Sequence, residues 1–82
     1  MDIGKRVREF ITSNFYVADA GSLTNEMSLL DQGIVDSTGV LEVIAFLESE
    51  FGFHVADEEM LPNNLDSIDK IAAFVGRKQG GA

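Results

Sequence analysis

Apolar residues repeat at helical spacing in three separate stretches of this 82-residue chain. In Asp2–Asn14 the apolar positions fall three or four residues apart, so they share one face of a helix. The stretches Ser37–Phe51 and Ser67–Val75 show the same spacing. Each stretch begins with residues that commonly cap helices, and glycines at 52 and 76 are expected to end the second and third. The pattern predicts an all-α fold with three main helices.

The segments between these helices differ in length and character. Phe15–Val35 is a loop of about twenty residues, which is tolerable if its apolar side chains pack back onto the bundle. Asp57–Glu59 predicts one short helical turn, with Met60 and Leu61 turned inward, and a loop is expected at 62–64. We therefore expect a small four-helix bundle, with three main helices and one short helix.

One domain accounts for the whole length. We expect it to cover residues 1–78, followed by a flexible tail at 79–82. The apolar faces predict a core that contains Ile3, Val7, Phe10, Ile11, Leu30, Ile34, Val43, Leu47, Phe51, Ile68, Ile71 and Val75.

The charged residues are segregated along the chain. All six Lys and Arg residues lie within the first eight or the last thirteen positions, and thirteen carboxylates lie between Glu9 and Asp69 with no Lys or Arg among them. An acidic surface of net charge −8 excludes nucleic acid as a partner and favours basic partner proteins, although plain solubility explains it too. Net repulsion favours a monomer. No stretch predicts a signal peptide or a membrane span, so we expect a cytoplasmic protein.

Ser37 is the strongest candidate in the sequence for a residue with a chemical role. It stands at the expected start of a helix, beside backbone N–H groups that have no intrahelical partner. A hydroxyl in this position suits attachment of a phosphate ester. A serine is also a common helix cap, and from local features alone either Asp36 or Ser37 supplies that cap here. The sequence pattern leaves these two roles of Ser37 open.

Other chemistries find less support in the sequence. The only histidine, His54, follows the far end of the Ser37 helix, so it is not positioned to activate the hydroxyl, and we expect it in a loop. Asp31 and Glu42 have the spacing of the first and last ligands of a calcium loop, but the positions between them lack the oxygen ligands and turn glycine. Without cysteine there is no thiolate chemistry. We predict neither a catalytic residue nor a metal site.

The whole pattern resembles acyl carrier proteins, which bind phosphopantetheine. The resemblance covers about residues 3–75 and includes the order of helices and the long first loop. The matching residues are Leu30-Asp31, Gly33, Asp36-Ser37, Glu42, Leu47-Glu48, Glu50-Phe51 and Asp57-Glu58-Glu59. It implies that Ser37 carries 4′-phosphopantetheine, which a phosphopantetheinyl transferase attaches from coenzyme A. The arm ends in a thiol that holds an acyl group as a thioester, and the protein itself is not an enzyme.

The resemblance also assigns two groups of contact residues. Partner enzymes with basic docking patches, such as acyl or aminoacyl ligases, synthases and acyltransferases, are expected to meet Asp36, Leu41, Glu42, Ala45, Glu48, Asp57 and Glu58. The acyl pocket is expected to involve Val43, Phe46, Leu47 and Ile71.

This chain departs from the family pattern at four places. Thr38 and Gly39 replace the usual leucine and a commonly acidic residue, Phe46 stands where a small residue is usual, and Met60–Asp66 is a few residues longer. We therefore predict a dedicated carrier for lipid or secondary-metabolite synthesis, with short or polar cargo, and not the main carrier of fatty-acid synthesis. An aminoacyl or D-alanyl carrier is the nearer alternative. A non-covalent acidic adaptor is the more distant one.

Overall fold

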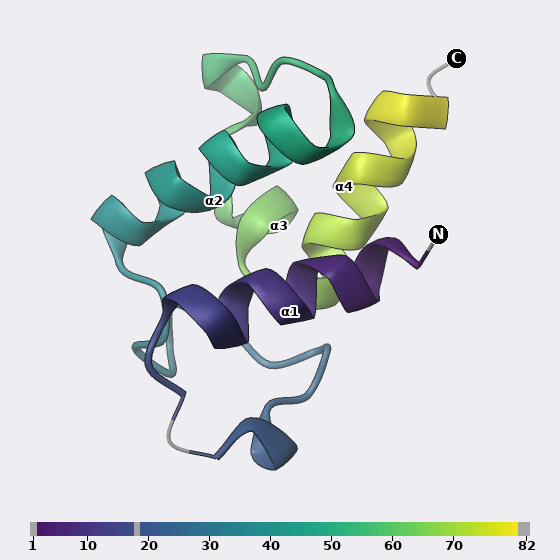
Figure 1. Ribbon diagram of the computed structural model, residues 1–82. Helices are drawn as coiled ribbons and strands as arrows, with labels where there is room; N and C mark the ends of the chain where they lie inside the picture. The colour runs from purple at the N-terminus through teal and green to yellow at the C-terminus, as the bar shows by residue number, and fades with distance from the viewer. Residues whose placement is uncertain (1, 18, 81–82) are drawn as a thin grey trace.

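The computed structural model describes residues 2–17 and 19–80 (Figure 1). Its regular elements are helices of very different lengths, joined by loops. No strand occurs in this part of the chain, so the expected all-α bundle of three main helices is confirmed. In chain order the elements are α1 (Ile3–Asn14), the 3-10 turn η1 (Ala20–Ser22), α2 (Ser37–Phe51), the 3-10 turn η2 (Asp57–Glu59), α3 (Pro62–Leu65) and α4 (Ile68–Gly80).

Side-chain caps fix the starts of α1 and α2 where the sequence predicts them. The Asp2 carboxylate accepts a hydrogen bond from the Lys5 backbone N–H, 3.1 Å away, and Asp36 caps α2 in the same way. Gly52 ends α2 in the left-handed conformation, with φ of 73°, which a residue with a side chain rarely adopts. Both helices therefore have the predicted bounds to within one residue.

The third main helix is longer than predicted. The buried Ser67 hydroxyl accepts the Lys70 N–H, 3.0 Å away, and α4 then continues past Gly76 to Gly80. The predicted helix end at Gly76 is wrong, because side chains of the following turn hold that turn against other elements, as described below. Residues 79 and 80, expected in the flexible tail, are helical, and the rest of that tail lies outside the described residues.

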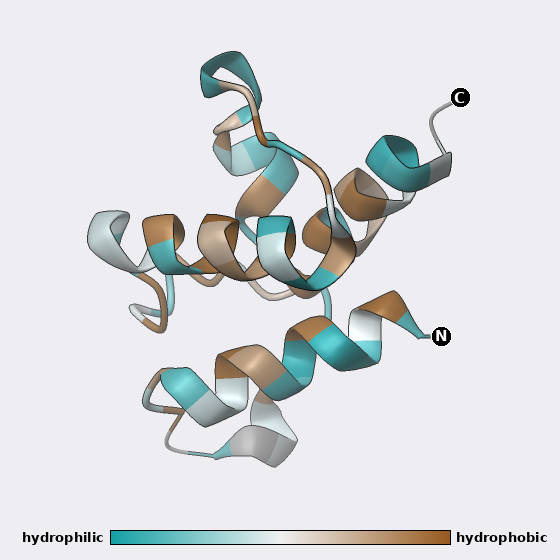
Figure 2. Ribbon diagram, turned by 45° about the horizontal axis from the view of Figure 1, so that its top comes forward, coloured by the Kyte–Doolittle hydropathy of each residue, from teal (hydrophilic) through white to brown (hydrophobic). Residues whose placement is uncertain are grey.

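The apolar faces meet between the helices as the spacing predicts. α4 packs against α1 and α3 and, less extensively, against α2. Figure 2 shows the hydrophobic residues of α1 on its side toward α2. Of the predicted core, Ile3, Phe10 and Ile34 are partly buried and Val7, Ile11, Val43, Leu47, Phe51, Ile68, Ile71 and Val75 are buried. The buried apolar residues outside this core list are Leu23, Leu29, Val35, Ile44, Val55, Leu65 and Phe74.

Asp66 organises the long first loop. Its backbone carbonyl accepts the Leu29 N–H at 2.7 Å, and its carboxylate accepts the Leu30 N–H at 2.9 Å and the Ser28 hydroxyl at 2.6 Å. This arrangement turns Leu29 into the core and leaves Leu30 37% exposed, so the prediction of Leu30 as a core residue is wrong. The loop otherwise packs back onto the bundle as expected, through Leu23, Leu29 and Val35.

The connection between α2 and α4 contains more helix than predicted. The expected turn at 57–59 is the 3-10 turn η2, but the expected loop at 62–64 belongs to α3. Proline suits the first turn of a helix, since the N–H that it lacks has no intrahelical partner there. Met60 is partly buried, whereas Leu61 is 49% exposed, so the inward orientation predicted for Leu61 is wrong.

Candidate functional site

Ser37 is the first residue of α2 and lies exposed at the surface. The Asp36 side chain accepts the Gly39 backbone N–H at 2.6 Å, so Asp36 is the cap that the sequence pattern left undecided. The Ser37 hydroxyl makes no hydrogen bond to any other residue within 2–17 and 19–80. The Ser37 hydroxyl therefore does not cap the helix.

The electrostatic setting of Ser37 favours an anion on its oxygen. The first N–H groups of a helix lack intrahelical partners, and the helix dipole places a partial positive charge at this end. A phosphate ester on Ser37 would lie beside these groups, which are suited to bind phosphate. Asp36, the N-cap of α2, and Glu42 in its second turn are both exposed. The site thus combines local affinity for one phosphate with an acidic surface around it.

An apolar cavity of about 190 Å³ lies directly beside Ser37. Four segments contribute to it, because its walls come from the end of the first loop, the first turn of α2, the residues before α3 and α3 itself. Its lining consists of Leu30, Ser37, Val40, Met60, Leu61, Pro62 and Leu65. The two leucines whose burial we predicted wrongly therefore face this cavity.

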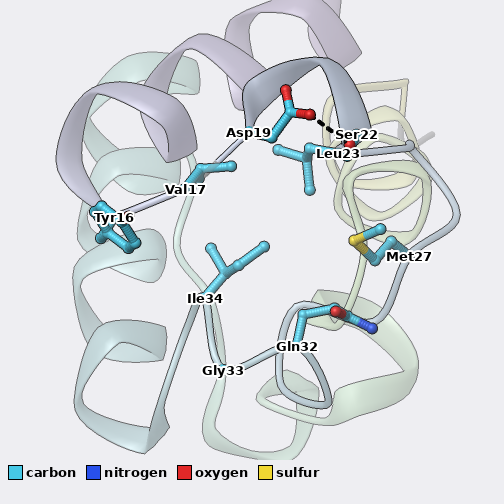
Figure 3. A pocket seen from close by; sticks show the side chains of 9 residues that line it. All are labelled: Tyr16, Val17, Asp19, Ser22, Leu23, Met27, Gln32, Gly33 and Ile34. Carbon is cyan, nitrogen blue, oxygen red and sulfur yellow. Dashed lines mark hydrogen bonds between the residues drawn. The ribbon is translucent and has the colours of Figure 1, made fainter.

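A larger cavity lies in the first loop and does not include Ser37. Figure 3 shows its lining, and its volume is about 300 Å³. The lining residues are Tyr16, Val17, Asp19, Ser22, Leu23, Met27, Gln32, Gly33 and Ile34. The Asp19 carboxylate accepts the Ser22 hydroxyl at 2.8 Å and the Gly21 N–H at 3.0 Å, and these bonds lower the pKa of Asp19. The Asp19 carboxylate is therefore used in closing the turn η1 and is not a free group for a ligand. For this reason we place the candidate site at Ser37.

The four residues predicted for the acyl pocket are not those that line the cavity beside Ser37. Val43, Leu47 and Ile71 are buried in the core. Phe46 faces α1, where its ring stacks on Phe10 with 4.2 Å between the centroids. Val40 was missed, although it stands three residues after Ser37 and so shares its helix face. The remaining lining residues come from separate segments, which no periodic pattern connects.

Six of the seven predicted partner contacts are exposed, and they are Asp36, Leu41, Glu42, Ala45, Asp57 and Glu58. Leu41 is 60% exposed, so its apolar side chain is accessible to a partner. Glu48 differs, because its carboxylate accepts the Val55 N–H at 2.8 Å and lies 3.1 Å from His54 Nδ1. Glu48 therefore holds the chain that follows α2, whatever its contacts with partners.

Alternative chemistries receive no support from the geometry. The His54 side chain is 85% exposed and contacts Glu48, not the Ser37 hydroxyl. Within residues 2–17 and 19–80, no three His, Cys, Asp or Glu side chains are grouped so that they could hold a metal ion. No helix in the same ranges combines the length and the apolar character that a membrane span requires.

The curated proteins that are similar to this chain include two carrier proteins. An acyl carrier protein from Solidesulfovibrio magneticus is 26% identical over 80 residues, which cover 98% of this chain and 99% of the relative. A D-alanyl carrier protein from Abiotrophia defectiva is 30% identical over 53 residues, which cover 65% of this chain and 67% of the relative. No family model matches the chain, and no solved structure matches it.

Proposed function

Because the chain belongs to the carrier protein family that includes acyl and D-alanyl carrier proteins, we propose that it carries an acyl group on 4′-phosphopantetheine attached to Ser37. Proteins of this family are not enzymes, and they generally carry this prosthetic group. The observation that carries the proposal is the exposed Ser37 hydroxyl, which Asp36 frees from helix capping, at an apolar cavity.

The residues around Ser37 fit such a group. In the attachment step the Ser37 Oγ would bond to the pantetheine-bearing phosphorus of coenzyme A. The pyrophosphate P–O bond would break, adenosine bisphosphate would leave, and a base of the transferase would take the hydroxyl proton. The N-terminal turn of α2 would hold the phosphodiester, and Val40 and Leu65, which line the cavity with Ser37, would offer apolar surface to the arm. The bound group supplies a thiol that holds the cargo as a thioester. This cysteine-free chain has no thiol of its own.

The acidic surface suits transient docking to several enzymes. A flexible tether raises the effective concentration of the cargo at a docked active site, so contact with each partner need only be brief. Opposite charges speed the encounter and add little to its lifetime. We assign to docking the acidic Asp36, Glu42, Asp57 and Glu58 and the apolar Leu41 and Ala45, all of which are exposed. The partners are a phosphopantetheinyl transferase and ligases, synthases or acyltransferases with basic patches, and the protein works as a cytoplasmic monomer.

The volume of the cavity limits the cargo that it shelters. An engineered cavity of about 150 Å³ in another protein binds benzene, so the 190 Å³ beside Ser37 accommodates about six to eight carbons. On the side of α2 toward α1, the stacked rings of Phe46 and Phe10 occupy the space. We therefore assign the protein to lipid or secondary-metabolite synthesis with short cargo, and not to the main pathway of fatty-acid synthesis.

Cargo length provides a prediction with a direct readout. Loading the arm with saturated chains of four, eight, twelve and sixteen carbons is expected to shift the amide signals of Val40, Met60 and Leu65. The shifts should grow up to about eight carbons and then remain constant, because longer chains extend into solvent. Nuclear magnetic resonance of each loaded form measures this. Continued growth that spreads to the Phe46 amide would contradict the size limit.

The proposal itself is tested by modification. Incubation with coenzyme A and a phosphopantetheinyl transferase is expected to raise the intact mass by one phosphopantetheine. If several transferases produce no gain, the chain is instead a non-covalent acidic adaptor.

A D-alanyl or aminoacyl cargo is the second candidate, and the similarity to the D-alanyl carrier protein favours it. Both cargoes use the same attachment to Ser37, so the ligase that loads the thiol separates them. Loading by a D-alanine ligase, with none by an acyl ligase, supports the second candidate.

A further inference from the structure

Part of the cavity beside Ser37 is built from a segment with little regular structure. Met60 and Leu61 line the cavity, and both belong to residues 53–61, which we call the wall segment. The short turn η2 is its only helical element. Val55 is buried, and the Phe53 ring packs edge-on against Phe74 with 6.0 Å between the centroids. The position of the cavity-lining end must therefore be fixed by other contacts.

The last turns of α4 supply the first of these contacts. Lys78 Nζ lies 2.8 Å from Glu59 Oε1, and both side chains are about three-quarters buried. The same carboxylate oxygen accepts the Ala56 backbone N–H at 3.0 Å. The Lys78 ammonium also lies 5.9 Å from the centroid of the Phe53 ring. The ion pair between Lys78 and Glu59 thus connects α4 to the end of the turn η2 at Glu59 and, through the Glu59 carboxylate, to its start at Ala56.

A second connection reaches the same point through Asn64. Arg77 donates to Asn64 Oδ1 at 2.9 Å, and Asn64 donates to the backbone carbonyl of Glu59 at 2.9 Å. That carbonyl also accepts the Leu61 N–H at 2.8 Å. Glu59 is therefore held by its side chain and by its backbone. Leu61, which lines the cavity, is hydrogen-bonded directly to the Glu59 backbone.

The charge state of Glu59 agrees with this arrangement. The hydrogen bond from Lys78, followed by the one from the Ala56 N–H, lowers the pKa of the Glu59 carboxyl. The shift favours the ionised carboxylate that the ion pair requires. Lys70, on the same helix, is exposed and its side chain makes no contact of this kind within the described residues. Lys78 is therefore distinguished from an ordinary solubilising lysine.

We propose that Lys78 and Glu59 are positioning residues of the cargo cavity, whose ion pair holds Met60 and Leu61 in place and so sets how a chain on Ser37 is sheltered. The role in sheltering cargo rests on the proposed function. The positioning of the wall segment does not depend on it, because every contact involved is made by the chain itself.

Hydrogen exchange of the unmodified chain tests the positioning. Lys78→Met is expected to speed exchange at the Ala56 and Leu61 amides about two- to five-fold, as suits a partly exposed ion pair. Exchange at the core Ile71 amide should not change. Glu59→Ala should speed exchange at least as much as Lys78→Met, Lys78→Arg should restore slow exchange, and Lys70→Met is the matched control without effect. Equal exchange in Lys78→Met and Lys70→Met overturns the proposal.

The loaded chain tests the role in sheltering. With an octanoyl chain on the arm, the Met60 methyl signal is expected to shift on loading in the original protein and in Lys70→Met. In Lys78→Met this loading shift should fall by at least half. A rise in exchange with an unchanged loading shift overturns the cargo role, because the ion pair then stabilises the segment without shaping the cavity. Absence of any mass gain on the original protein refutes the proposed function instead, and leaves the exchange result standing.

Discussion

Ser37→Ala is expected to abolish phosphopantetheine attachment and to change the free energy of unfolding by no more than about 0.5 kcal/mol. The first effect follows because alanine removes the only atom to which the group is attached. The second follows because the Ser37 hydroxyl makes no hydrogen bond within the described residues, and Asp36 supplies the helix cap. Intact mass after treatment with coenzyme A and a transferase measures the first, and urea unfolding measures the second.

Asp36→Ala is the matched variant with the opposite expectation. It removes the acceptor of the Gly39 N–H, so the free energy of unfolding should fall by about 1 kcal/mol. The hydroxyl of Ser37 is still present, and the variant should gain the full mass after long incubation. If Ser37→Ala proves as destabilising as Asp36→Ala, the serine contributes to the cap and the separation of the two roles is wrong. A mass gain that persists in Ser37→Ala places the attachment at another residue.

The sequence predicts those parts of this fold that depend on residues close to one another in the chain. The bounds of α1 and α2 follow from apolar spacing and from Asp2, Asp36 and Gly52, which are neighbours of the turns they shape. The end of α4 could not be predicted in the same way. Arg77 and Lys78 continue the helix because they bind Asn64 and Glu59, which are distant in sequence. Such tertiary contacts outweigh the weak preference of a glycine to stop a helix.

Some residues of the candidate site could likewise be predicted from local sequence, and others could not. Ser37 is predictable because it stands at the start of a strongly periodic helix. The cavity beside it is not, since Leu30, Val40 and Leu65 come from three separate elements. Leu30 and Leu61 were predicted to point inward simply because they are apolar. Their exposure follows from backbone bonds to the Asp66 carboxylate and the Glu59 carbonyl, and only the folded chain shows these bonds.

Gly39 and Gly76 illustrate how one residue type serves two different purposes in helices. Gly39 is buried, and a Cβ added there would lie 2.7 Å from Cε1 of the Phe15 ring. The Phe15 ring is itself held edge-on against Phe10, with 6.0 Å between the centroids. A Cβ added at Gly76 would meet no atom within 4 Å. Any side chain at position 39, including the acidic one that the resemblance leads us to expect, therefore requires the Phe15 ring to shift.

Gly39→Ala is consequently expected to lower the free energy of unfolding by about 1 kcal/mol, because steric strain of about 1–3 kcal/mol outweighs the gain in helix propensity. Gly76→Ala makes the same chemical change without the clash and should raise it by about 0.5–1 kcal/mol. Urea unfolding of both variants measures the difference, which should approach 2 kcal/mol. In a Phe15→Ala background the clash is gone, so Gly39→Ala should there become neutral or stabilising. Equal stabilisation by both alanines in the original background would mean that the Phe15 ring moves aside freely, and the absence of an acidic residue at position 39 would then need another cause.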